Sequence, residues 1–178
     1  MTDQLKLVWI DLEMTGLNPD VDVILEVACI ITGPDLKPRA ETEAVIAAPA
    51  DALGRMSDFV RDMHTKNGLL ARVAKATVTV QQAEQQVLAL VQKHCKQGEG
   101  VLAGNSIHQD RRFLYRYMST LESYLFYRQV DVSTLKVLRE AWYPATPKFD
   151  KPGKDHTALA DIKDSIAELA YYRANLLR

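Results

Sequence analysis

Residues 5–13 have the sequence Leu5-Lys6-Leu7-Val8-Trp9-Ile10-Asp11-Leu12-Glu13. The segment 5–11 is rich in Leu, Val, Trp and Ile, which predicts a buried strand. Side chains alternate across a strand, so residues two apart point to the same side. We therefore expect the carboxylates of Asp11 and Glu13 to face one spot, where they repel each other unless a cation lies between them.

Strands separated by short turns are expected in the first quarter of the chain, and helices dominate the rest. The expected strands span residues 5–11, 21–32, 40–47, 100–104 and 126–132. The expected helices span residues 57–64, 67–74, 80–96, 109–118, 133–142 and 156–177. This order predicts an α/β fold with a mixed sheet, in which an antiparallel meander continues into parallel strands reached through helical crossovers.

Length and composition limit the class of protein. A chain of 178 residues without a long linker predicts one domain over residues 1–178. With 47% hydrophobic and 25% charged residues, the composition excludes a disordered or fibrous chain. The net charge of −1 excludes broad electrostatic capture of nucleic acid, although a local basic patch could still bind a small anionic substrate.

The cysteines and the N-terminal segment bear on location. Two cysteines, Cys29 and Cys95, form no disulfide framework and no metal-binding pattern, which favours a reducing compartment. The apolar run over 5–10 is short, contains Lys6 and leads into Asp11, so we expect no signal peptide. The sequence contains no stretch of about 18 apolar residues, so we expect no membrane span. A cytoplasmic protein without a membrane partner is expected.

Three further side chains draw attention after the acidic pair. Asp110 follows the strand 100–104 and a turn, so it should begin a helix at the same end of the sheet as Asp11. By itself it could simply be a carboxylate in the first turn of a helix, where the helix dipole favours negative charge. His156 and Asp161 are five residues apart, which in a helix is a rotation of about 500°, so they do not share one face. We expect His156 on a loop or first turn and Asp161 one turn into the helix.

These residues favour a particular chemistry. Four carboxylates from separate segments can hold two hard divalent cations, which activate a water and stabilise the leaving oxygen of a phosphodiester. A neutral histidine near pH 7 can accept the proton of that water. The sequence has neither a Gly-x-Ser-x-Gly elbow nor a Walker-type loop. Hydrolytic phosphoryl transfer is therefore favoured over acyl transfer.

Three motifs resemble those of the DEDDh 3′-to-5′ exonucleases, which have a ribonuclease H-like fold. They are Asp11-Leu12-Glu13, the segment 105–110 (Asn-Ser-Ile-His-Gln-Asp) and His156-x-x-x-x-Asp161. Further stretches resemble the oligoribonuclease subfamily, so that the resemblance extends over nearly the whole chain. They span residues 9–17, 63–69, 105–115, 127–135 and 167–173.

The resemblance implies a homodimer that removes nucleotides from the 3′ end of very short RNAs, dinucleotides included, and releases 5′-mononucleotides. It implies that two Mg²⁺ or Mn²⁺ ions are bound by carboxylates and that His156 is the general base. The implied metal ligands are Asp11, Glu13, Asp110 and Asp161.

The resemblance also implies a set of substrate-binding residues. Leu17 would separate two bases, and Phe59 would stack on one of them in a position where the family usually has Trp. Arg128 would come from the partner subunit and cap the 5′ phosphate, because a guanidinium grips phosphate in a bidentate manner. The full implied set is Leu17, Phe59, His64, Ser106, Gln109, Tyr127, Arg128 and Ser133.

Other functions stay open from the sequence alone. A DEDDh exonuclease that trims longer RNA or DNA 3′ ends is one alternative, although Tyr127-Arg128 and the near-neutral charge disfavour it. A small-molecule nucleotide phosphodiesterase is another, because a pocket for two nucleotides could accept related diphosphates. A catalytically silent binding module would be expected to lack a carboxylate or His156, and none is missing.

Overall fold

The computed structural model describes residues 5–151 and 157–177. In this part of the chain five strands form one sheet in the order β3-β2-β1-β4-β5. The strands are β1 (Lys6–Met14), β2 (Ile24–Thr32), β3 (Pro38–Val45), β4 (Gly100–Gly104) and β5 (Gln129–Asp131). Strands β1, β2 and β3 pair antiparallel, whereas β4 pairs parallel with both β1 and β5. The predicted mixed sheet is confirmed.

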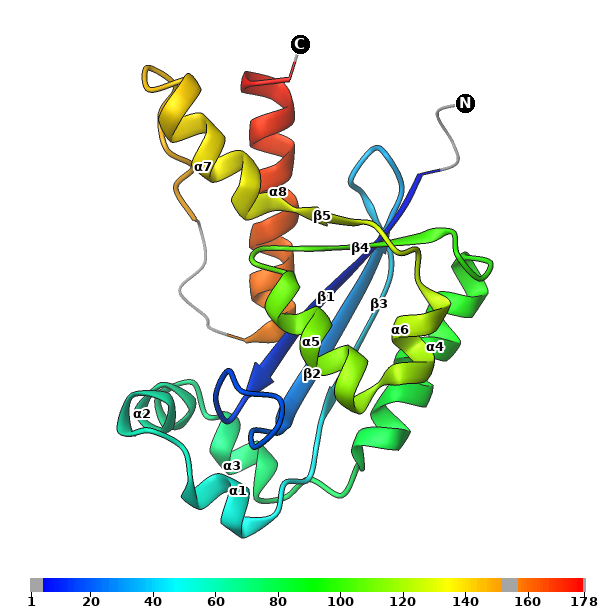
Figure 1. Cartoon of the computed structure of the whole chain (residues 1–178), viewed down its shortest axis with the longest axis vertical. Helices are drawn as coiled ribbons and strands as arrows, with labels where there is room; N and C mark the ends of the chain where they lie inside the picture. The colour runs from blue at the N-terminus through cyan, green and yellow to red at the C-terminus, as the bar shows by residue number, and fades with distance from the viewer. Residues whose placement is uncertain (1–4, 152–156, 178) are drawn as a thin grey trace.

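Eight helices surround this sheet within the same residues (Figure 1). They are α1 (Ala50–Gly54), α2 (Asp58–Lys66), α3 (Leu69–Val73), α4 (Val80–His94), α5 (His108–Tyr117), α6 (Ser119–Tyr124), α7 (Val132–Trp142) and α8 (Ala158–Asn175). None of them is long and apolar enough to cross a bilayer. The sequence analysis missed α1 and α6.

Tertiary contacts explain the short helix α6. The backbone N–H groups of Thr120 and Leu121 both donate to Oε1 of Glu84 in α4, at 2.7 and 3.0 Å. First-turn N–H groups have no partner inside their own helix, and here a distant carboxylate supplies one. Leu121 is fully buried against the core on that side. A local pattern could not reveal a cap that comes from another helix.

Two predicted strands are shorter in the structure, and both differences have local causes. Strand β2 begins at Ile24 rather than 21, because Asp22 closes the preceding turn through bonds from Asn18 N and Thr15 Oγ1. Strand β5 begins at Gln129 rather than 126. The segment before it is held instead by the guanidinium of Arg111, which donates to the carbonyl oxygens of residues 126 and 127.

The alternation of β1 separates two cores. Val8, Ile10 and Leu12 pack on the side of α4, α5 and α6. Leu7 and Trp9 pack on the other side, against α7 and α8. Because Asp11 and Glu13 continue the row of Leu7 and Trp9, their side chains emerge on the face that α8 covers. The alternation of side chains at the end of β1 therefore places the acidic pair directly beside α8.

Candidate active site

Three carboxylates meet at the end of β1. Oxygen atoms of Asp11, Glu13 and Asp161 all lie within 4.8 Å of one another. Asp161 stands in the first turn of α8, where Thr157 caps the helix by accepting a hydrogen bond from Ala160 N at 3.3 Å. The predicted position of Asp161, one turn into the helix, is confirmed. His156, which directly precedes Thr157 in the sequence, lies outside the described residues.

Asp110 completes the acidic group from a third element. It lies in the first turn of α5, and its Oδ1 accepts a hydrogen bond from the backbone N–H of Leu12 at 2.9 Å. Leu12 stands between Asp11 and Glu13, so this bond fastens the start of α5 to the acidic end of β1. The side chain is buried, and its charge raises the pKa of Asp11. The structure thus brings the four predicted carboxylates together.

The surroundings of these carboxylates disfavour their charged form and so raise their pKa values. Burial raises the pKa of Glu13 to about 7, with further contributions from Asp161 and Glu26. Burial likewise raises the pKa of Asp110 to about 7. The pKa of Asp11 is raised most clearly by burial and then by the charges of its acidic neighbours. Hard oxygen donors that repel one another in a buried site fit a divalent cation, because its charge relieves both penalties.

Two cationic side chains lie at the edge of this acidic group. Lys151 Nζ is 3.7 Å from Asp161 Oδ1, and its charge lowers the pKa of Asp11. Arg72 of α3 binds both carboxylate oxygens of Glu26, with its second contact at 3.3 Å. Glu26 is fully buried and is the β2 residue directly opposite Glu13. The sequence analysis missed this ion pair, because its members are 46 residues apart and no motif joins them.

His64 lies against the acidic group rather than on the surface. It is fully buried, its Nε2–H donates to the carbonyl of Met14 at 2.9 Å, and its Nδ1 is 3.8 Å from Glu13 Oε2. Among the described residues Nδ1 has no hydrogen-bond partner. The imidazole therefore lies beside the Glu13 carboxylate in the protein interior. Any contact between His64 and a substrate would require the surrounding side chains to open.

Two apolar side chains of the predicted substrate site are exposed. Leu17, in the turn after β1, is 61% exposed, and Phe59, in the first turn of α2, is 77% exposed. Ser57 caps α2 by accepting a hydrogen bond from Val60 N. Large apolar groups presented to solvent on a capped helix and a hydrogen-bonded turn are available to stack on a ligand. The structure leaves both side chains free for the roles that the resemblance implies.

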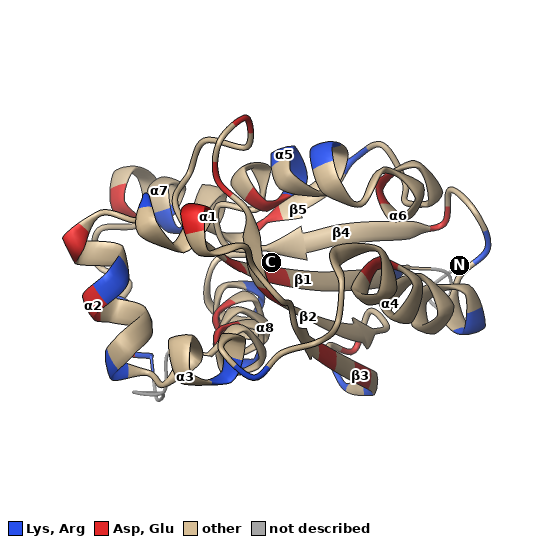
Figure 2. Ribbon diagram, turned by 90° about the horizontal axis from the view of Figure 1, so that it is seen from below, with Lys and Arg blue, Asp and Glu red and all other residues tan. Residues whose placement is uncertain are grey.

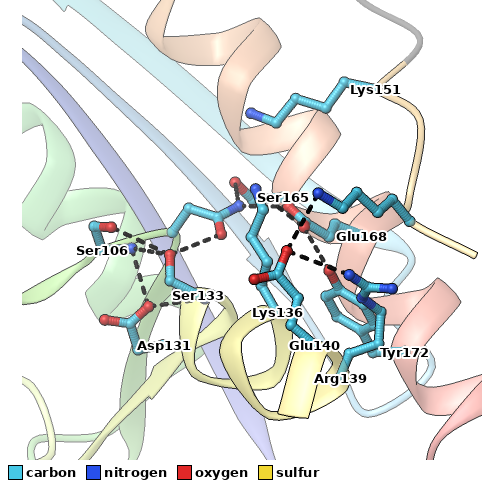
Figure 3. Close-up of polar contacts among 12 residues, drawn as sticks. Ser106, Asp131, Ser133, Lys136, Arg139, Glu140, Lys151, Ser165, Glu168 and Tyr172 are labelled. Atoms are coloured by element: carbon cyan, nitrogen blue, oxygen red, sulfur yellow. Dashed lines mark hydrogen bonds and ion pairs between the residues drawn. The ribbon is translucent and has the colours of Figure 1, made fainter. Parts of the chain in front are cut away.

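Ser106 and Ser133 lie together at the start of α7 (Figure 3). Their Oγ atoms are 3.2 Å apart, and the backbone N–H of Ser106 donates to Ser133 Oγ and to Asp131 Oδ1, both at 2.9 Å. Ser106 has a left-handed backbone with φ 50°, a strained conformation for a residue other than Gly. Gln109, half-buried beside Asp110, accepts a hydrogen bond from Arg112 through Oε1.

Tyr127 and Arg128 are both exposed, between α6 and β5. The guanidinium carbon of Arg128 lies 5.0 Å from the centre of the Tyr127 ring, in a cation–π contact. Arg111 donates to the carbonyl oxygen of Tyr127 at 2.9 Å and so holds this backbone in place. The pair is therefore presented outward on a fixed segment.

Basic residues also gather on α5, as Figure 2 shows by its blue segments. They line a hollow of about 530 Å³ that does not include the acidic group. Arg111 forms a 3.0 Å ion pair with Glu122, so it adds no free positive charge to this surface. Residues 111–128 contain four Arg and one Glu, so the positive charge that Glu122 does not offset rests on Arg112, Arg116 and Arg128.

Comparison with known proteins agrees with this geometry. The RNase T exonuclease family matches residues 8–169. The oligoribonuclease of Paracidovorax citrulli is 46% identical, over 97% of this chain and 90% of its own length. The oligoribonuclease of Pseudomonas aeruginosa strain PAO1 is 45% identical, over 100% of this chain and 99% of its own length.

Solved structures of low sequence identity share the fold. Exonuclease I from Methylocaldum szegediense superposes with a TM-score of 0.70 at 18% identity, and E. coli exonuclease I in complex with a 5cy-dA13 oligonucleotide with 0.69 at 13% identity. They cover 97% and 98% of this chain, which spans only 41% and 42% of theirs. The expected ribonuclease H-like fold is confirmed. The chain belongs to the oligoribonuclease family of exonucleases and is a hydrolase of phosphodiester bonds.

Proposed function

We propose that this enzyme is a 3′-to-5′ exoribonuclease that hydrolyses short oligoribonucleotides, dinucleotides in particular, to 5′-mononucleotides. The convergence of four carboxylates from β1, α5 and α8 is the observation that carries this proposal. Full-length identity of about 45% to proteins named oligoribonuclease supports RNA as the substrate. The paired hydroxyl groups of Ser106 and Ser133 support recognition of a short substrate by its end.

Two divalent ions, Mg²⁺ or Mn²⁺, would be held by Asp11, Glu13, Asp110 and Asp161. Their oxygen donors are of the kind that both ions prefer, and their mutual repulsion is what a cation relieves. When bound, such ions supply a water of lowered pKa and neutralise charge on the leaving oxygen. The chain's own part is to hold these carboxylates in place, which the Leu12 N–H does for Asp110.

His156 is proposed as the general base that accepts the proton of the attacking water. The support comes from the sequence, where His156 precedes Asp161 at the spacing of the family motif. Leu17 and Phe59 would contact the two bases, and stacking on an aromatic ring is worth about 1–3 kcal/mol per base. Gln109 would complete the binding site near the acidic group, and the buried His64 would join it once the side chains that cover it open.

Ser106 and Ser133 would bind the 5′ phosphate together with the partner subunit's Tyr127 and Arg128. The exposure of these last two side chains, and their fixed backbone, support a role across a subunit boundary. A phosphate gripped in this way would stop a longer chain from passing through the site. The proposal thus includes a homodimer, one domain per chain and a cytoplasmic location.

The proposal is tested with 5′-labelled RNAs of two, five and twenty nucleotides, in Mg²⁺ and in EDTA. Metal-dependent loss of the dinucleotide, with the longest RNA scarcely touched, is the expected result. Rapid trimming of the longest RNA that stalls at short products would instead indicate a general 3′ exonuclease. Inactivity on all three RNAs, with hydrolysis of a dinucleoside polyphosphate, would indicate a small-molecule phosphodiesterase.

A further inference from the structure

Asn105 joins the start of α7 to α8 through hydrogen bonds to Ser133, Ser165 and Glu168. These three partners are labelled in Figure 3. Its Oδ1 accepts a hydrogen bond from Ser133 Oγ at 3.1 Å. Its Nδ2 donates to Ser165 Oγ at 2.9 Å and to Glu168 Oε2 at 3.0 Å. A primary amide has two N–H donors, so these contacts use both of them and fix the orientation of the group.

On the α8 side, the network reaches the turn that contains a predicted metal ligand. Ser165 Oγ–H donates to the backbone carbonyl of Asp161 at 2.8 Å and accepts from Asn105. Ser165 is 5% exposed, and bonds between buried polar groups are stronger than those in water. A continuous path of hydrogen bonds therefore leads from Asn105 to the first turn of α8.

On the α7 side, the network orients a hydroxyl group of the proposed phosphate site. Ser133 gives its proton to Asn105, so it acts as the acceptor for the N–H of Ser106. The contact between the two hydroxyl groups is then donated by Ser106 Oγ. Asn105 thus determines where the Ser133 hydroxyl points before a ligand arrives.

Glu168 anchors the amide from below. Its carboxylate is 1% exposed and accepts a hydrogen bond from Tyr172 Oη at 2.9 Å, while Lys136 Nζ lies 3.7 Å away. A buried carboxylate is tolerated when donors and a cation surround it, and removing one of them carries a large penalty. Rotation of the Asn105 amide would place its carbonyl oxygen against Glu168, so one orientation is strongly favoured.

We propose that Asn105 is a positioning residue that fixes the separation between Ser133 and the Asp161 turn, and thereby sets the substrate length. The inference rests on the proposed function, in which the serines bind the 5′ phosphate and the acidic group acts at the scissile bond. The distance between the serines and the acidic group then determines how many nucleotides fit between the 5′ phosphate and the scissile bond. An enzyme in which this distance is less well fixed binds the phosphorylated dinucleotide less tightly, while its binding of longer RNAs changes little.

The test compares Asn105→Ala and Ser165→Ala with the wild type on 5′-phosphorylated RNAs of two and five nucleotides. Asn175→Ala is the matched control, since Asn175 donates to Tyr171 O on the exposed end of α8. For Asn105→Ala we expect the dinucleotide-to-pentanucleotide ratio of kcat/KM to fall about tenfold, mainly through KM of the dinucleotide. Ser165→Ala should shift the ratio in the same direction by a smaller factor.

Two further measurements separate positioning from a general structural role. The Mn²⁺ dissociation constant, from calorimetry, should change little in Asn105→Ala, because the metal-binding side chains are intact. In a double-mutant cycle with Ser133→Ala, the effects on dinucleotide KM should be clearly less than additive, because Asn105 acts through Ser133. If Asn105→Ala melts too low to assay, Asn105→Ser and Ser165→Ala provide the same comparison.

The proposal is overturned if the wild type prefers the dinucleotide and the variants keep that preference, or if they lose the same factor on both RNAs. A wild type without any preference for the dinucleotide would instead contradict the proposed function, and this inference with it.

Discussion

The backbone N–H of Leu12 and the Oδ1 of Asp110 are joined by a 2.9 Å hydrogen bond across 98 positions of sequence. The bond places one carboxylate oxygen of α5 against the strand segment that contains Asp11 and Glu13. Asp110 therefore has two tasks, a structural one that needs only an acceptor and an electrostatic one that needs a charge.

The substitution Asp110→Asn separates these tasks. The amide oxygen still accepts from Leu12, so the melting temperature should stay near that of the wild type, while the lost charge should lower kcat at least about a hundredfold. Asp110→Ala should be equally inactive and also less stable by about 1–3 kcal/mol, because a buried N–H loses its partner. Asp35→Asn, in an exposed turn, is the control. Substantial activity in Asp110→Asn would refute the metal assignment.

Stability of the metal-free enzyme should depend on pH in an unusual direction. Burial raises the pKa of Glu13 and Asp110 to about 7 in the folded state, against about 4 in an unfolded chain. Between these values the folded protein binds more protons than the unfolded one, so the free energy of unfolding falls as pH rises and levels off above about 7. Calorimetry in EDTA should show a lower melting temperature at pH 7.5 than at pH 5.

Addition of a metal ion and removal of one carboxylate charge both test this dependence of stability on pH. Mg²⁺ or Mn²⁺ should raise the melting temperature at neutral pH and have less effect near pH 5, because protons compete with the cation for the same oxygens. The variant Glu13→Gln should flatten the decline in EDTA. A melting temperature that increases from pH 5 to 7.5 in both proteins would count against the assigned pKa values.

Phe59 offers a graded test of base stacking. Its ring is 77% exposed, so its removal should leave stability almost unchanged. Phe59→Ala should raise KM for the dinucleotide about tenfold, whereas Phe59→Trp should lower KM because a larger ring offers more stacking surface. Val137→Ala, another exposed apolar residue, serves as control. Equal KM values for all three variants would remove Phe59 from the substrate site.

Arg128 can be tested for action across the proposed subunit boundary. Arg128→Ala and Asp110→Asn should each be nearly inactive on a 5′-phosphorylated dinucleotide. Mixed dimers of the two variants should regain activity, because one site then has intact carboxylates together with the partner subunit's Arg128. Subunits are mixed after mild denaturation, and exchange is verified by mass spectrometry. Exchange without recovery would place Arg128 in its own subunit's site or in neither.

Local patterns were sufficient for much of the architecture. The apolar run over residues 5–11 predicted the strand. The alternation of side chains along it predicted the shared face of Asp11 and Glu13, because alternation is a property of the backbone. Asp161 was placed in the first helical turn by the same kind of argument. Helix α6 was missed because its start depends on Glu84 from another helix.

Other features had no local signal. The burial of His64 beside Glu13 follows from how α2 packs on the end of β1, whereas the family resemblance implied only a place in the substrate site. Arg72 was unremarked in the sequence, yet it compensates the buried charge of Glu26 next to Glu13. Asn105 belonged to a motif, but nothing in that motif indicated its bonds to α8.

The linear sequence thus specified which groups have the chemistry: the acidic residues, their order, and the strand and helix on which they stand. These follow from backbone periodicity and from side-chain type, which act over a few residues. Packing of α5 and α8 against β1 specified the rest, namely the separation of the carboxylates, the burial that raises their pKa values and the bonds of Asn105. Those properties depend on distance and on exclusion of water, and both exist only once segments far apart in the chain have come into contact.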